Sequence, residues 1–137
     1  MRRSLLTALA VLPFAAHAQE VAAKPVRVVV QVSEADPARW NLALNNVQNL
    51  QEELGAAKVT VEIVAFGPGI AMLKFDAATN SRITEAVKNG VAVQACENTM
   101  RAQKLVRADM HPGVGYVPAG VVEIVRRQQE GWAYLRP

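Results

Sequence analysis

The sequence predicts an α/β protein, specifically a three-layer α/β/α sandwich with a mainly parallel sheet of about five strands. Patterns typical of strands and of helices alternate roughly five times along the chain. The first strand pattern, residues 26–32, is a nearly continuous run of β-branched side chains, which is typical of a central strand covered on both faces. The connections between strand patterns are long enough for parallel crossovers.

Residues 1–18 have the organisation of a signal peptide. A pair of arginines is followed by an apolar stretch and then by Ala16-His17-Ala18, which matches a small-x-small cleavage site. A retained membrane anchor is the alternative, but the apolar run is short and contains Pro13, whereas a spanning helix needs about 20 apolar residues. We therefore expect cleavage after Ala18, a periplasmic or secreted protein without stable membrane insertion, and a single domain at residues 19–137.

The mature chain is expected to be nearly neutral. The full sequence has 15 Lys and Arg against 12 Asp and Glu, and removing residues 1–18 takes away two arginines and no acids, which leaves a net charge of +1. The mature chain has no basic run and no interleaved aromatics, the features that would favour binding of nucleic acid. Gly67-Pro68-Gly69 lacks the spacing of a dinucleotide-binding loop. The expected mature chain has one histidine, His111, and one cysteine, Cys96, which are too few for a soft metal site. We predict no nucleic-acid partner, no cofactor and no metal.

The first half of the chain is predicted to contain a strand, a long helix and a second strand. After the first strand, Asp36 is placed as a helix N-cap and Pro37 as the first helical residue. We expect a helix at about residues 38–54, ended by Gly55. Its apolar side chains recur at three- and four-residue steps and define a buried stripe of Trp40, Leu44, Val47, Leu50 and Leu54. Residues 59–65 alternate apolar and polar side chains, which predicts a strand with one face less deeply covered or a strand closer to an edge.

The second half continues the alternation. Short helices are expected at residues 70–75 and 81–89, the second with Ser81 as its N-cap. The remaining expected elements are a strand at 91–96, a helix at 99–108 with Met100, Leu105 and Val106 inward, a strand at 114–117, a helix at 121–130 and a strand at 132–135. In the last helix we expect Val122, Ile124 and Val125 to be buried, and Glu123, Arg126 and Arg127 to form an exposed face.

Cys96 lies at a predicted strand-to-helix junction, where polar residues suited to a helix cap follow a strand of small and β-branched side chains. In an open parallel sheet, ligands bind where the strands end, and a helix N-terminus favours a thiolate over a thiol. The loops that follow the strands meet at this edge. They contain the residues that we assign to the site: Ser33, Glu34, Phe66, Gly67, Cys96, Glu97, Asn98, Pro118, Ala119 and Gly120.

Spacing alone leaves the role of Cys96 open. One cysteine cannot form an internal disulfide, so in an oxidising compartment it suggests a reactive group or an intermolecular partner, and the alternative is an inert thiol packed as a small hydrophobe. Helix-terminal amides, with Arg101 or Lys104 if they turn back, favour a thiolate, whereas the adjacent Glu97 opposes it. A catalytic pair with His111 is disfavoured because that residue precedes a strand, at the opposite edge of the sheet.

Three motifs carry a resemblance to a known family. They are Ala95-Cys96-Glu97-Asn98-Thr99-Met100, residues 117–123 and residues 126–134, in this order. With these motifs, nearly the whole mature domain resembles the DsrE/DsrF-like family of sulfur-relay-type α/β proteins, and is most similar to an exported, largely uncharacterised branch of it.

The resemblance implies a parallel five-stranded sheet, assembly into homotrimers or hexamers, and a role for Cys96 as sulfur carrier. In the sulfur-relay members, the matching cysteine holds a persulfide and passes sulfane sulfur from a donor to an acceptor protein. Backbone amides of Glu97 and Asn98 would then stabilise the thiolate or persulfide anion. The alternative function is a non-catalytic oligomeric module that binds a small ligand or a protein at the strand-end cleft, with Cys96 as packing.

Overall fold

The computed structural model describes residues 25–137, so the predicted signal peptide at residues 1–18 lies outside the described residues. The strands are β1 (Val26–Val32), β2 (Val59–Ala65), β3 (Ala92–Cys96), β4 (Gly115–Val117) and β5 (Ala133–Leu135). The α-helices are α1 (Pro37–Leu54), α2 (Asn80–Lys88), α3 (Glu97–Ala102) and α4 (Gly120–Gln129). The 3₁₀ helices of the same part of the chain are η1 (Gly67–Leu73) and η2 (Arg107–Asp109). None of these helices is long and apolar enough to cross a membrane.

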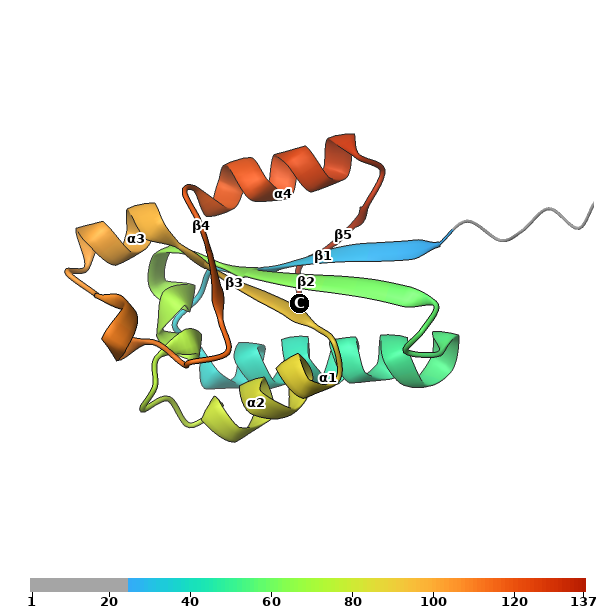
Figure 1. Ribbon diagram of the computed structural model, residues 1–137, viewed down its shortest axis with the longest axis horizontal. Coiled ribbons are helices and arrows are strands. Elements are labelled where there is room, and N and C mark those ends of the chain that lie inside the picture. Colours follow the sequence, from blue (N-terminus) through green and yellow to red (C-terminus); the bar gives the residue numbers. More distant parts are fainter. Residues whose placement is uncertain (1–24) are drawn as a thin grey trace, which may run out of the picture.

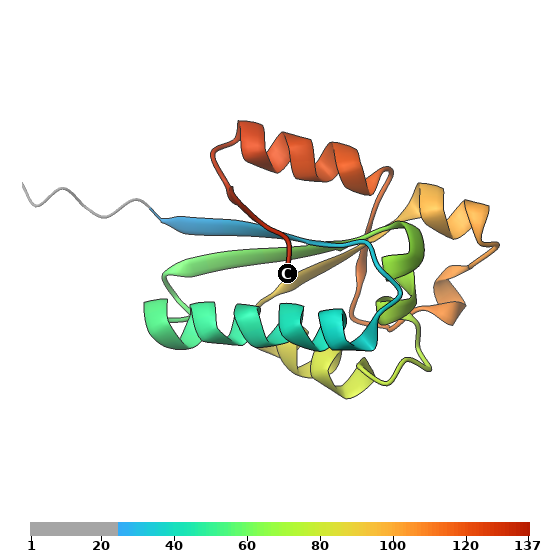
Figure 2. The same cartoon turned by 180° about the vertical axis from the view of Figure 1, so that it is seen from behind.

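The elements form three layers around one sheet. α1 and α2 lie on one face, and α4 lies on the other (Figure 1), an arrangement that the view from behind also shows (Figure 2). The sheet has five strands in the order β4-β3-β2-β1-β5, and each neighbouring pair is parallel. The predicted α/β class with about five mainly parallel strands is therefore confirmed.

The sheet divides the apolar core into a large part and a small part. Side chains alternate between the two faces of a strand, so Val28 and Val30 of β1 join the larger cluster on the side of α1 and α2, whereas Val29 faces α4. The buried members of the smaller cluster are Val29, Val64, Val117 and Ile124. α4 therefore covers its face of the sheet with little apolar contact.

α1 begins as predicted, but its buried stripe is shorter than expected. The Asp36 carboxylate accepts the Ala38 N–H at 2.9 Å, Pro37 is the first helical residue, and Gly55 ends the helix in the left-handed region at φ 88°. The burial predicted for Leu54 is wrong, since that side chain is exposed. An 18-residue helix is about 27 Å long, whereas a seven-residue strand spans about 23 Å, so the last turn of α1 outruns the sheet.

Between β2 and β3 the structure differs from the prediction in two places. η1 is a 3₁₀ helix that begins at Gly67, earlier than the helix expected at residues 70–75. It lies so close to the end of β1 that a Cβ on Gly69 would come within 2.3 Å of the Val32 carbonyl oxygen. α2 is preceded by Thr79 rather than capped by Ser81, and the Thr79 hydroxyl is buried and donates to the Met72 carbonyl at 3.0 Å.

α3 begins immediately after Cys96 and is shorter than the helix predicted at residues 99–108. It ends after Ala102 because Lys104 adopts the left-handed conformation, with φ 55°, and turns the chain out of the helix. Met100 is buried as expected, whereas Val106 lies beyond the turn and is exposed.

The inward face of α4 is more polar than predicted. Val122 and Val125 are exposed, and Glu123 is buried beside Ile124. The prediction that β2 has one thinly covered face or lies closer to an edge is also wrong, since Glu62 at its centre is only 1% exposed and β2 is the middle strand of the sheet. Glu62 and Glu123 can both be buried because each contacts Arg127, whose Nε lies 2.7 Å from Glu62 Oε2 and 3.0 Å from Glu123 Oε1.

Candidate functional site

Cys96 is the last residue of β3 and the N-cap of α3, at the carboxyl edge of the sheet. Its side chain is buried, with 4% of the residue exposed. The Gly120 backbone N–H donates to Cys96 Sγ at 3.3 Å, and Gly120 is the first residue of α4. The first amides of a helix have no partner within the helix and carry the positive end of its dipole. The sulfur therefore accepts a hydrogen bond where an anion is best stabilised.

Strand pairing brings these two segments together. β3 and β4 are parallel with Cys96 opposite Val117, so the chain leaving β4 passes directly beside the sulfur. The Pro118 carbonyl accepts the Asn98 N–H at 3.2 Å, which ties this segment to the start of α3. Gly120 also packs against Phe66, because a Cβ there would come within 3.0 Å of the Phe66 Cβ. The close approach of α4 to the sulfur thus depends on a residue without a side chain.

Thr99 links three parts of the site. It is the third residue of α3, and its Oγ1 accepts the Gly67 N–H at 2.9 Å, so its own proton remains available as a donor. The Thr99 side chain also hydrogen-bonds with Cys96. The sequence suggested a helix cap at this position first and a ligand contact second, and the i to i+3 spacing from Cys96 is the feature that could have indicated a contact with the sulfur.

The environment favours the ionised form of Cys96. Burial acts to raise the pKa of the thiol, but hydrogen bonding by the Thr99 side chain and by the backbone amides of Gly120, Thr99 and Asn98 acts in the opposite direction. The net effect is a pKa below the ordinary value for a cysteine. Because the thiolate is the nucleophilic form, this arrangement suits sulfur chemistry.

Glu97 and Arg101, next to Cys96 in α3, are engaged with partners other than the sulfur. Glu97 lies 4.0 Å from Arg107 at the surface, and Arg107 also covers the Tyr116 ring with its guanidinium carbon 4.1 Å from the ring centre. Arg101 donates to the Asn98 side-chain oxygen. The stabilisation of the sulfur therefore comes from amides and a hydroxyl.

Ser33 and Glu34 follow β1 and are not part of this cluster. β2 lies between β1 and β3 in the sheet, so the end of β1 is two strands away from Cys96. Glu34 is paired with Arg39 at 2.9 Å and with Arg136 at 2.8 Å, while Ser33 Oγ accepts from Gln31. The cavity beside them measures about 10 Å³, which is room for one water molecule at most. Of the ten predicted residues, Cys96, Phe66, Gly67, Asn98, Pro118 and Gly120 are joined by the contacts described above.

His111 is held in a separate hydrogen-bonded position. Its Nδ1 accepts the Gly113 N–H at 2.9 Å, and its Nε2 lies 2.7 Å from Thr84 Oγ1. Since Nδ1 is an acceptor, Nε2 carries the proton and donates to the threonine. Both ring nitrogens are therefore used in fixing the segment before β4, and the expectation that His111 does not pair with Cys96 agrees with this geometry.

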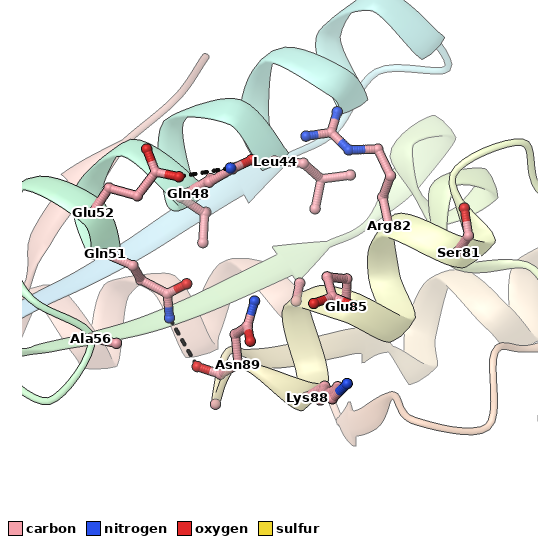
Figure 3. A pocket seen from close by; sticks show the side chains of 13 residues that line it. Leu44, Gln48, Gln51, Glu52, Ala56, Ser81, Arg82, Glu85, Lys88 and Asn89 are labelled. Atoms are coloured by element: carbon pink, nitrogen blue, oxygen red, sulfur yellow. Dashed lines mark hydrogen bonds between the residues drawn. The ribbon is translucent and has the colours of Figure 1, made fainter.

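A wide groove lies elsewhere, between α1 and α2 (Figure 3). It has a volume of about 730 Å³, and several of its polar side chains are bonded to their neighbours. Gln51 donates to the Asn89 carbonyl at 3.0 Å, and Arg82 donates to Asn41 and Asn45, each at 2.7 Å. We do not assign the functional site to this groove.

The fold and the Cys96 cluster define an α/β protein of DsrE/YchN-like fold with a thiol at the strand-end edge of its sheet. The chain is similar to a solved structure of a protein of unknown function, MTH1491 from Methanobacterium thermoautotrophicum. The two share 41% identity over 82% of this chain and 99% of that chain, with a TM-score of 0.78. The chain belongs to the same family as MTH1491.

Two more distant structures are similar in fold alone. They are the conserved protein of unknown function BT1422 from Bacteroides thetaiotaomicron (12% identity, 81% of this chain and 94% of that chain, TM-score 0.67) and the ychN protein from E. coli (13% identity, 82% and 99%, TM-score 0.67). No protein-family model and no curated protein matches the sequence.

Proposed function

We propose that the protein is a sulfur carrier that accepts and donates sulfane sulfur through a persulfide on Cys96. The observation that carries this proposal is the position of the sulfur, which accepts the first amide of α4 at 3.3 Å and has a lowered pKa. The donors that stabilise a thiolate also stabilise a persulfide anion, because both place negative charge at the same edge.

The proposed transfer needs neither a metal nor a nucleotide. The Cys96 thiolate attacks the outer sulfur of a donor persulfide, a new S–S bond forms at Sγ, and the S–S bond of the donor breaks. The electron pair of the broken bond leaves with the donor as its thiolate, so the transfer involves no net oxidation. The reverse step delivers the outer sulfur to an acceptor thiolate.

Access to the sulfur is local. Cys96 is buried, but Asn98 and Pro118 on either side of it are exposed, so the sulfur lies directly beneath the surface. A donor that contacts this edge needs to displace little of the protein. The predicted export and cleavage after Ala18 would place this exchange in the periplasm or outside the cell.

We also propose that the protein forms a homo-oligomer, a trimer or a hexamer, through α4. Val121, Val122 and Val125 are each more than half exposed and form an apolar surface on this helix. The surface begins one residue after Gly120, so a partner bound to it would reach the edge at Cys96. A sulfur donor or acceptor protein is the other partner that this surface would suit.

The test is intact mass of the mature protein after exposure to inorganic polysulfide, with Cys96→Ser as the matched variant. We expect a gain of one sulfur per chain that a reductant removes, and no gain in Cys96→Ser. Undiminished loading of the variant would contradict the proposal, as would no gain on a thiol that reacts with iodoacetamide in the folded protein.

The burial of Cys96 favours one competing function, a non-catalytic binding module in which the thiol is packing. The two candidates differ in the reactivity of the thiol. Alkylation of the folded protein near neutral pH supports the carrier, whereas resistance until unfolding supports the binding module.

A further inference from the structure

A buried carboxyl pair lies beneath α4, away from Cys96. Glu62 is in the middle of β2 and Glu123 is in the first turn of α4, and neither is more than 6% exposed. Arg127 Nε lies 2.7 Å from Glu62 Oε2 and 3.0 Å from Glu123 Oε1, so a single N–H is shared by the two carboxyl groups. The other oxygen of Glu62, Oε1, is buried without a hydrogen-bond partner within residues 25–137.

The charges around Glu62 and Glu123 balance when the two carboxyl groups together hold one proton. The ionisable groups on this face are Glu62 of β2, Cys96 of β3, Glu123, Arg126 and Arg127 of α4, Glu130 directly after α4, Arg27 of β1 and Tyr134 of β5. Arg27 is engaged elsewhere, since it donates to the Glu130 backbone carbonyl and lies over the Trp132 ring. This leaves two arginines facing three carboxyl groups, so one carboxyl group is in excess.

Glu62 is the carboxyl group that holds this proton. Burial and hydrogen bonding to Glu123 raise the pKa of Glu62 to about 7, whereas the hydrogen bonds from Glu62 and Arg126 more than offset burial and lower the pKa of Glu123. Below about pH 7, the protonated Glu62 therefore donates a hydrogen bond to the ionised Glu123. Above this range, two ionised carboxylates meet in a nearly dry space with Arg127 between them.

α4 connects this pair to the sulfur. The inward residues of α4 are Gly120, Glu123, Ile124 and Arg127. Glu123 belongs to the pair, Arg127 contacts both of its carboxyl groups, and Gly120 donates to Cys96 Sγ. Glu123 lies three residues after Gly120, within one helical turn. Because the helix is rigid over so short a distance, a change in how Glu123 sits on the sheet must also change how the Gly120 N–H meets the sulfur.

We propose that Glu62, Glu123 and Arg127 are positioning residues for Cys96, and that proton loss from the buried pair shifts α4 so as to weaken the hydrogen bond from Gly120 to the sulfur. This inference rests on the proposed function in one respect, namely that the stabilised thiolate is the working form of Cys96. The arrangement makes the first amide of α4 responsive to pH near neutrality.

The test follows the Gly120 amide resonance by ¹⁵N–¹H NMR from about pH 5 to about pH 9 in the wild-type protein, in Glu62→Gln and in Cys96→Ser. We expect an inflection near pH 7 at Gly120 in the wild type and in Cys96→Ser, and its loss in Glu62→Gln, which remains neutral. Glu130→Gln removes the half-exposed carboxylate of the same network and should keep the inflection. Gly55, which follows the far end of α1, serves as the internal reference and should not show the inflection.

The proposal is overturned if Gly120 shows no inflection in the wild type. It is also overturned if the inflection disappears in Cys96→Ser, since the thiol would then explain it, or if it persists in Glu62→Gln, since another group would then explain it. The wild-type and Cys96→Ser titrations require no change at Glu62, so absence of the inflection in either one contradicts the proposal even if Glu62→Gln does not fold. Sulfur loading is a separate measurement. Failure of loading with a retained inflection defeats the proposed function and leaves the positioning role in place.

Discussion

The two faces of the sheet are built in different ways. The face toward α1 and α2 is a continuous apolar core, in which residues such as Ile63 and Leu73 have no solvent exposure. The face toward α4 has a small apolar cluster, an ion-pair network and the sulfur of Cys96. One face therefore supplies most of the stability, and the other holds the groups that can do chemistry. The separation allows α4 to be held by charge, which can change with pH, without endangering the fold.

Truncating a large side chain on each face of the sheet should give the largest difference in stability between the two faces. Ile63→Ala leaves a cavity in the larger core and should lower the free energy of unfolding by about 3–4 kcal/mol. Ile124→Ala, on the partly exposed helix of the other face, should cost about 2 kcal/mol, because the smaller cluster can relax around the lost volume. Urea unfolding of both variants measures the difference, and equal costs would show that the two faces contribute alike.

Glu62→Gln should stabilise the protein in a pH-dependent way. Because the folded pKa of about 7 is above the ordinary value of 4.5, the native state holds a proton that the unfolded chain releases, so the wild type loses stability as pH rises between these values. The variant does not titrate there and should gain about 2–3 kcal/mol relative to the wild type by pH 8. Urea unfolding at about pH 5 and pH 8 tests this. A difference that is the same at both values would show that Glu62 does not retain its proton.

Thr99→Val should raise the pKa of the Cys96 thiol, because it removes the side-chain hydrogen bond that lowers it. The rate of alkylation by iodoacetamide at neutral pH should fall roughly three- to tenfold. Thr99→Ser retains the hydroxyl and is the matched control, which should react at close to the wild-type rate. Equal rates in the Val and Ser variants would exclude Thr99 from the stabilisation of the thiolate.

Val122→Ser should have the smallest effect on the folded chain and a separate effect on assembly. The side chain is 62% exposed, so the free energy of unfolding of the monomer should change by no more than about 0.5 kcal/mol. If α4 is the interface between copies, light scattering after size exclusion should find a smaller species than in the wild type. Val106→Ser, at a similarly exposed valine outside α4, is the control. An unchanged mass in Val122→Ser would remove α4 from the proposed interface.

Local patterns in the sequence were sufficient for the fold class and most elements. The β-branched run of residues 26–32, the Asp36-Pro37 start of α1 and the three- and four-residue apolar steps that follow are short-range features, and backbone preference and side-chain period act over the same short range. The position of Cys96 at the end of a strand followed from the same patterns. The extents of η1 and α3 did not follow from these patterns, because they depend on the packing of Gly69 against β1 and on the left-handed turn at Lys104.

The composition of the site and the polarity of the α4 face were decided by tertiary structure. Strand order separates Ser33 and Glu34 from Cys96, and the β3–β4 pairing brings the Gly120 amide to the sulfur, yet neither is encoded in any short stretch of sequence. Spacing alone suggested that Glu123 and Arg127 were solvated, because it could not show that Glu62 faces them from another strand. Periodicity identifies which face of an element is apolar, whereas the partner across the layer determines which charges can be buried.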